Sequence, residues 1–198
     1  MTRDRFATRA AILDSAVTIL STLGAPALRI NALAHAAKCD KVLIYRYFGG
    51  LDGVLEALGA ERMLWPRVEI GEDNDGSSLA DAVRTALLEE WAAITDGALV
   101  RAAVAAESNG IGALQPAVAA QRAESHVRVI AQLRAAHRIP QYTDLPALVE
   151  LMSAALAMLA LRGAPATQST DSATPDGRRR IEKMVGAITR ALLEPSGG

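Results

Sequence analysis

The sequence INALAHAAKCDKVLIYRYF, which runs from Ile30 to Phe48, decides how the N-terminal part of this chain folds. Apolar residues recur at helical spacing over 30–37, and a two-residue break follows them. Asp40 is then a favourable N-cap residue for a second short helix over 41–48. Two short helices joined by a tight turn predict a helix-turn-helix, the motif that lays its second helix in the major groove of DNA.

Charge is distributed unevenly along the chain, although its net value is only −1 at pH 7. Residues 1–50 hold seven basic and three acidic residues, whereas the remainder holds 14 basic and 19 acidic residues. An N-terminal segment of opposite sign to the body is expected where only that segment meets phosphate groups. Chance clustering is the alternative explanation.

Composition points to an all-α fold. The 198 residues are 51% hydrophobic, aromatic residues are scarce, and alanine, the strongest helix former, is abundant. Alternating runs of Val, Thr and aromatic residues, which would indicate strands, do not occur. Cys39 is the single cysteine, so neither an intrachain disulfide nor a cysteine-based zinc site is expected.

Apolar periodicity, capping residues and Gly or Pro breaks predict about nine helices and no strand. Two stretches rich in small and polar residues, 71–78 and 163–177, are predicted loops. The predicted helices cover 4–23, 30–37, 41–48, 51 to beyond Trp65 with a kink or an end at Pro66, 78–96, 98–108, 115–138, 145–162 and 175–193.

Neither a membrane span nor a signal peptide is indicated. The N-terminus carries charges where a signal peptide needs an apolar core. The most hydrophobic run, 145–161, is short for a span and contains Pro146 and Glu150, which favours a buried helix. We therefore expect a cytoplasmic protein that does not contact membranes.

Residues 11–58, AILDSAVTILSTLGAPALRINALAHAAKCDKVLIYRYFGGLDGVLEAL, resemble the DNA-binding domain of the TetR (tetracycline-repressor) family. The match extends in register across three helices, whereas residues 60–198 match only in the number and layout of helices. Its points are Ile12, Leu13, Asp14, Ser15 and Ala16, then Gly24, Ile30, Leu33, Ala34, Ala36 and Ala37, and finally Lys41, Tyr45, Phe48 and Gly49.

The resemblance implies an all-α homodimer with a helix-turn-helix domain in 1–50 and a helical ligand-binding and dimerisation domain in 51–198. It also implies a small effector, expected to be mostly apolar, whose binding in the second domain releases a palindromic operator. Independently, the helices 145–162 and 178–193 have more apolar surface than one small body would cover, which favours pairing with a second copy. No cofactor is expected.

Seven residues are expected at the DNA. The resemblance implies that Lys41 and Tyr45 contact phosphate and that Arg46 lies at or near the groove. For the two tyrosines, packing or simple exposure is the alternative. The expected DNA-binding set is Arg29, Lys41, Val42, Leu43, Tyr45, Arg46 and Tyr47.

Four residues of this segment depart from the family pattern. Lys38 replaces a glycine whose left-handed backbone suits the turn, and Arg29 replaces a Ser or Thr N-cap but could reach a phosphate. Val42 and Leu43 replace a small residue and a hydroxyl, and Leu43 could meet a thymine methyl. These changes predict an operator sequence of its own rather than a different fold.

Candidate effector contacts are less sharply defined. By resemblance, the helices around the ligand cavity carry Met63, Trp65, Trp91, Glu107, Asn109 and His126. Core packing is the favoured alternative for both tryptophans, and a structural histidine with satisfied hydrogen bonds is the favoured alternative for His126. The three histidines show no metal-ligand spacing, so no metal site is expected.

These observations favour a ligand-responsive DNA-binding transcriptional regulator, most readily a repressor. The alternatives are a helical interaction module without DNA binding and an enzyme on the same fold. An enzyme is not expected, since the sequence shows no paired carboxylates at helical spacing, no metal set and no nucleophile with a base.

Overall fold

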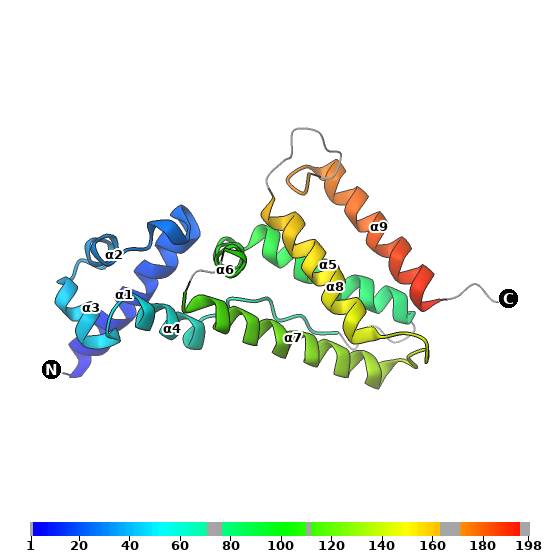
Figure 1. The fold of residues 1–198 in the computed structure, drawn as a ribbon, viewed down its shortest axis with the longest axis horizontal. Coiled ribbons are helices and arrows are strands. Elements are labelled where there is room, and N and C mark those ends of the chain that lie inside the picture. Colours follow the sequence, from blue (N-terminus) through cyan, green and yellow to red (C-terminus); the bar gives the residue numbers. More distant parts are fainter. Residues whose placement is uncertain (1, 71–76, 110–111, 163–170, 195–198) are drawn as a thin grey trace. The chain divides into compact units, whose positions relative to one another are not determined.

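A computed structural model describes residues 2–70, 77–109, 112–162 and 171–194, and within these ranges every regular element is helical (Figure 1). The predicted all-α class and the prediction of about nine helices are confirmed for these ranges. The elements are α1 (Thr2–Leu23), a short 3-10 helix η1 (Ala25–Ala27), α2 (Ile30–Ala36), α3 (Lys41–Phe48), α4 (Leu51–Glu61), α5 (Leu79–Asp96), α6 (Ala98–Ser108), α7 (Leu114–Ala136), α8 (Leu145–Leu161) and α9 (Pro175–Leu193).

The chain forms two compact units. Unit 1 comprises Met1–Trp65 and Gly97–Gln121, and unit 2 comprises Pro66–Asp96 and Arg122–Gly198. The first turns of α7 belong to unit 1 and its remainder belongs to unit 2. The two units are defined by packing. The predicted boundary at residue 50 between a DNA-binding and a ligand-binding domain is a functional division, and it stays a prediction.

Unit 1 is built around the apolar face of α1. Ile12 and Leu20 of this helix are buried, as are Leu33 of α2, Ile44 of α3 and Leu58 of α4. α1 contacts α2, α4 and α6, and α3 contacts α2 and α4. Full burial of one such side chain stabilises the fold by about 1.5–3 kcal/mol. A shared core of this kind holds the predicted helix-turn-helix in place.

By length and hydropathy alone, the Arg5–Leu23 part of α1 would also suffice to cross a membrane. In unit 1, however, one face of α1 is buried against neighbouring helices, and the other carries exposed polar residues such as Asp14 and Thr18. This distribution is that of an amphipathic core helix.

The expectation that the helix starting at residue 51 extends past Trp65 is wrong, because α4 ends at Glu61. A proline at position 66 has no backbone N–H to donate to the carbonyl of Arg62, and it also disfavours helical geometry at the preceding residue. The carbonyl oxygen of Arg62 instead accepts a hydrogen bond from the side chain of Gln121 on α7, whose Nε2 donates at 3.0 Å.

Gln121 fixes the end of α4 through three further backbone groups. Its Nε2 also donates to Gly59 O at 2.9 Å, and its Oε1 accepts from Leu64 N at 2.8 Å and from Trp65 N at 3.1 Å. α4 and α7 approach closely here, since a Cβ atom on Gly59 would lie 2.3 Å from the Cβ of Ala117. The side chain of Gln121 therefore forms hydrogen bonds with four backbone groups that a continuous helix would have paired internally.

Unit 2 consists of α5, α8, α9, the larger part of α7 and the non-helical segment 66–70. α5 packs against both α8 and α9. The buried apolar residues include Val83, Leu87 and Ile94 of α5, Val129 and Leu133 of α7, Val149 and Leu156 of α8, and Ile181 and Val185 of α9.

Helix starts follow the capping residues that the sequence supplies. The Asp40 carboxylate accepts from Val42 N at 2.9 Å, and the Asp144 carboxylate accepts from Ala147 N at 3.0 Å. Ser78 Oγ accepts from the backbone N–H three residues on. The predicted starts of α3, α5 and α8 are thus confirmed. Within the predicted loops, residues 71–76 and 163–170 lie outside the described residues.

Candidate nucleic-acid interface and ligand cavity

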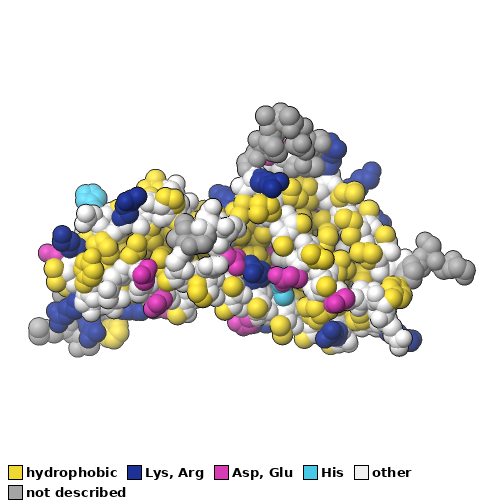
Figure 2. Space-filling model, in the orientation of Figure 1, with side chains coloured by type: hydrophobic (Ala, Val, Ile, Leu, Met, Phe, Trp, Pro, Cys, Tyr) yellow, Lys and Arg dark blue, Asp and Glu magenta, His cyan; other side chains and the backbone are white. Residues whose placement is uncertain are grey.

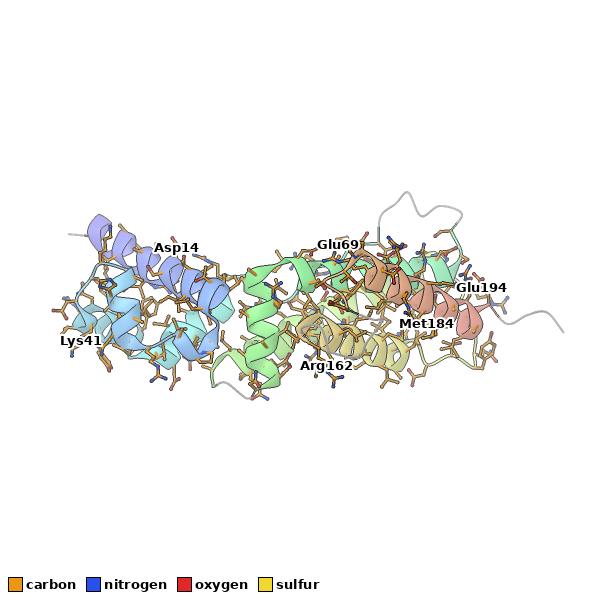
Figure 3. The ribbon with its side chains drawn as sticks, turned by 90° about the horizontal axis from the view of Figure 1, so that it is seen from above. Asp14, Lys41, Glu69, Arg162, Met184 and Glu194 are labelled. Carbon is orange, nitrogen blue, oxygen red and sulfur yellow. The ribbon has the colours of Figure 1, made fainter. Side chains whose placement is uncertain are left out.

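The second helix of the helix-turn-helix, α3, has one buried side and one exposed side. Ile44 is fully buried in the core of unit 1. Lys41, Val42, Tyr45 and Arg46 are exposed, and Lys41 extends outward from the start of the helix (Figure 3). Figure 2 shows Lys and Arg side chains, in dark blue, at several places over the α1–α3 part of the chain, among apolar side chains in yellow.

Both ends of α3 are fixed by local chemistry. The capping carboxylate of Asp40 closes its start, and Gly49, at φ 77°, provides the left-handed residue that ends it. The next helix begins directly afterwards, and a Cβ atom on Gly53 would lie only 1.7 Å from Phe48 O. A glycine at position 53 therefore lets α4 start against the end of α3.

Two arginines of α1 cover aromatic rings of α3. The guanidinium of Arg5 lies 5.7 Å from the ring centroid of Tyr47, and that of Arg9 lies 5.2 Å from the ring centroid of Phe48. Arg9 also donates to Glu61 on α4, with one Nη1–Oε2 distance of 3.0 Å. Tyr47 is only partly exposed and packs under an arginine, so it is less open to a partner than Tyr45.

The two backbone departures from the family pattern are visible in the geometry. Lys38 has φ 51°, and it is the one residue other than glycine with a positive φ among the described residues. Arg29 stands at the N-cap of α2 without a side-chain capping bond, and its Nε instead donates to Pro26 O at 3.3 Å. The turn thus uses the left-handed conformation expected from the resemblance, with a side chain that does not favour it.

A small cavity lies within unit 2. It leaves room of ≈ 10 Å³, about one water molecule, inside ≈ 280 Å³ of unfilled space that includes its opening to solvent. Its apolar wall is formed by Val68, Val83, Ala86, Leu87, Val129, Leu133 and Val149, and its polar groups are Glu90 and His126.

These two polar residues belong to a cluster of five, the Glu90–His126 cluster, which also contains Arg122, Glu150 and Ser153. His126 Nε2 lies 3.1 Å from Glu90 Oε2, and its Nδ1 lies 2.9 Å from Glu150 Oε2. Ser153 Oγ donates to the other oxygen of Glu90. Arg122 Nε lies 3.8 Å from Glu150 Oε1. Three helices, α5, α7 and α8, contribute to the cluster.

The geometry indicates that His126 is an imidazolium. Each ring nitrogen faces a carboxyl oxygen, and an ionised carboxylate can only accept, so with both glutamates ionised both nitrogens carry a proton. Burial lowers the pKa of His126, but the hydrogen bonds and charges of Glu90 and Glu150 outweigh this effect and raise the pKa overall. The preferred interpretation of His126 as a histidine with satisfied hydrogen bonds thus agrees with its surroundings.

Of the six residues named as candidate effector contacts, His126 lines the cavity and the other five do not. Trp65 in unit 1 and Trp91 in unit 2 are buried core residues, 2% and 3% exposed. Met63 is 61% exposed, Glu107 is partly exposed, and Asn109 is an exposed residue at the C-cap of α6.

Sequence reasoning missed Glu90. A signal for it was present, because Val83, Leu87, Glu90 and Ile94 form one helical stripe in which only the third residue is charged. A carboxylate within an apolar stripe indicates a buried partner. Its partner histidine lies 36 positions away, however, and helical spacing does not reveal such a pairing.

Comparison with known proteins supports the fold. No family model and no curated protein matches the sequence. A Rhodococcus sp. protein assigned to the TetR family of transcriptional regulators superposes with a TM-score of 0.62 at 21% identity, covering 92% of this chain and 98% of that one. Salmonella enterica GusR superposes with a TM-score of 0.57 at 18% identity, covering 94% of this chain and 95% of its own. The chain therefore has the fold of TetR-family transcriptional regulators.

Proposed function

We propose that the protein is a DNA-binding transcriptional regulator of the TetR family that responds to a small ligand. The observation that carries the proposal is the exposed side of α3. A helix of eight residues, capped at both ends and anchored through Ile44, presents Lys41, Val42, Tyr45 and Arg46 to solvent. A rigid helix with cations and apolar groups on its outer side is suited to phosphates and base edges.

The proposed contacts divide by chemistry. Lys41 and Tyr45 bind phosphates, and Arg46 reaches the major groove. Val42 is 61% exposed, whereas Leu43 is only partly exposed, so Val42 is the better placed of the two to meet a thymine methyl. Arg29 and Tyr47 are secondary contacts, since each is already engaged within unit 1.

A homodimer is part of the proposal. The outer sides of α8 and α9 expose large apolar side chains, with Leu151 at 71%, Met158 at 42%, Met184 at 57% and Leu192 at 48% exposure. Pairing these helices with those of a second copy across a two-fold axis would cover them. Two α3 helices related by that axis would fit a palindromic operator with half-sites about one helical turn apart, or a multiple of it.

The regulatory part of the proposal places the DNA-binding domain in residues 1–50 and the ligand-binding and dimerisation domain in residues 51–198. The cavity of unit 2, with its apolar wall and few polar groups, is the proposed effector site. Effector binding there releases the operator, which makes the protein a repressor. The protein acts in the cytoplasm, without an enzymatic activity.

The direct test is footprinting and fluorescence anisotropy on DNA from the protein's own promoter region. We expect a protected palindrome and an affinity that falls with salt, because phosphate contacts release counterions. Lys41→Ala with Arg46→Ala should weaken binding by about 100-fold or more, since each contact contributes about 1–3 kcal/mol.

The matched control is Arg134→Ala with Arg138→Ala, two exposed arginines of unit 2, which removes the same charge. This control should leave affinity nearly unchanged. Promoter binding that survives the Lys41 and Arg46 substitutions would instead show that α3 is not the element that reads DNA.

A further inference from the structure

The ligand cavity contains a carboxylate that its packing does not require. Glu90 is 5% exposed, and its neighbours along the cavity wall are Val83, Ala86 and Leu87 from the same helix. A carboxylate taken out of water costs several kcal/mol unless it is paired and hydrogen-bonded. An apolar residue of similar size would fill the same space without this cost. The charge at position 90 therefore calls for a functional explanation.

The cation that faces Glu90 is one that can give up its charge. His126 donates to Glu90 with Nε2 and to Glu150 with Nδ1, and an imidazolium can lose one of these protons near neutral pH. After losing the Nε2 proton it would still donate to Glu150 through Nδ1–H. Glu90 would then need another cation at the position that the imidazolium N–H occupied.

We propose that the effector is a small apolar amine whose ammonium group pairs with Glu90 while His126 releases a proton. This inference rests on the proposed function and names the class of its ligand. One positive charge enters and one proton leaves, so the net charge of the cluster does not change. The apolar wall, including Val68, Leu87 and Val149, surrounds the hydrocarbon part of the amine.

A cation fits this cavity better than an anion or a neutral molecule. The lining contributes the carboxylate of Glu90, and that of Glu150 lies directly behind His126. An anionic ligand would have to approach these two carboxylates. A neutral ligand could use the apolar wall but would gain nothing from Glu90.

The side of the cavity that can move to make room for a ligand is segment 66–70, which has no helical hydrogen bonds. Val68 belongs to segment 66–70, which is attached to α7 by Ser125 Oγ donating to Pro66 O at 2.9 Å and by Ile70 N donating to Gln132 Oε1 at 3.0 Å. Displacing Val68 breaks fewer backbone bonds than displacing a residue of α5, α7 or α8. The segment is therefore the side of the cavity that yields to a ligand.

The charged groups around His126 come from four elements: α5, α7, α8 and segment 66–70. α5 contributes Glu90, α8 contributes Glu150, and α7 itself contributes Arg122 beside Glu150. On the side of segment 66–70, Arg67 pairs with Glu124 and Glu69 pairs with Arg128. His126 is thus the group in the cluster whose charge changes most easily, because the arginines remain protonated.

The test uses three probes with the same apolar body and different charge: cyclohexylmethylamine, cyclohexylmethanol and cyclohexanecarboxylate. Isothermal titration calorimetry on the full-length protein without DNA should show the amine binding about tenfold or more tightly than the alcohol, and the carboxylate most weakly. Below the raised pKa of His126, the amine affinity should rise about tenfold per pH unit, because one proton leaves on binding. The alcohol affinity should not change with pH.

Three variants tie the preference to the cluster. Glu90→Gln keeps the shape and should abolish the preference for the amine, whereas Glu89→Gln, on the exposed side of the same helix, should preserve it. His126→Gln should still bind the amine but without the pH dependence. Circular dichroism at the start of each titration verifies that each variant is folded.

Two results would overturn the inference. One is binding of the alcohol or the carboxylate as tight as that of the amine, and the other is no amine binding at about 10 mM, where even a site with a Kd near 1 mM is filled. Operator release is measured separately by anisotropy. Amine binding by a protein that binds no operator would refute the regulator and the effector role, whereas operator binding without amine binding would refute the ligand class alone.

Discussion

The outer side of α3 and the Glu90–His126 cluster both collect charged residues, yet they do so in opposite surroundings. Lys41 and Arg46 stand in water on a short capped helix, and the charges of Glu90 and His126 are enclosed by apolar side chains. In water a charge costs little to hold and little to remove, so α3 can change its residues without loss of fold. In the cluster each charge depends on its partner, because removing one partner leaves the other buried charge uncompensated.

This contrast makes the two regions separable by experiment. Alanine substitutions of the exposed side chains of α3 should act on binding and leave stability nearly unchanged, and substitutions in the cluster should act on stability and on its pH dependence.

Replacing His126 by leucine should have the largest effect on stability. The change leaves the buried carboxylate of Glu90 without the cation that faces it, which typically costs about 3–5 kcal/mol. Urea denaturation followed by circular dichroism measures the loss. His35→Leu, at an exposed position of α2, is the matched control and should cost less than about 0.5 kcal/mol. Equal losses of unfolding free energy in the two variants would show that burial does not make His126 more important for stability than His35.

Gln121→Leu should destabilise the protein by about 2–3 kcal/mol. It deprives Arg62 O, Leu64 N and Trp65 N, together with one carbonyl of α4, of their side-chain partner, and unsatisfied buried groups cost about 1–3 kcal/mol. Gln115→Leu makes the same change at an exposed position of α7 and should have little effect. The readout is again the urea midpoint. This pair tests whether a neutral buried group behaves like the charged cluster.

The free energy of unfolding should fall as pH rises above about 6.5, the pKa of an unperturbed histidine. The folded-state pKa of His126 is raised, so its stabilising contribution is complete below the unfolded pKa and is lost as pH passes through the folded pKa. Denaturation curves at a series of pH values measure this slope. In His126→Gln the decline over this window should disappear, and its persistence there would assign it to another group.

Lys38→Gly should have the smallest effect and the opposite sign. A lysine at φ 51° pays a left-handed penalty of about 1 kcal/mol, and glycine removes it at some cost in unfolded-state entropy. We expect a gain of about 0.5 kcal/mol in thermal denaturation, with operator affinity unaffected. Lys41→Gly, within α3, should instead lose stability, since its backbone is already helical.

Local chemistry allowed much of the fold to be predicted from the sequence. The starts of α3, α5 and α8 follow from Asp40, Ser78 and Asp144, because a capping side chain acts within three residues of itself. The left-handed turn at residue 38 follows from the resemblance to the TetR family, whose pattern has glycine at this position, and not from Lys38 itself. Local sequence features of this kind led to the prediction of an all-α fold with a helix-turn-helix, and the structure confirmed the all-α class.

The features that only the tertiary structure decided depend on contacts between residues far apart in the chain. The end of α4 depends on Gln121, and the Glu90–His126 cluster depends on Glu90, His126 and Glu150 coming together from three helices. Helical periodicity tells which face of a helix is apolar, but it does not tell which faces meet. The sequence alone therefore determined most of the elements and the exposed α3 surface, whereas packing decided where α4 ends and where the buried charges found their partners.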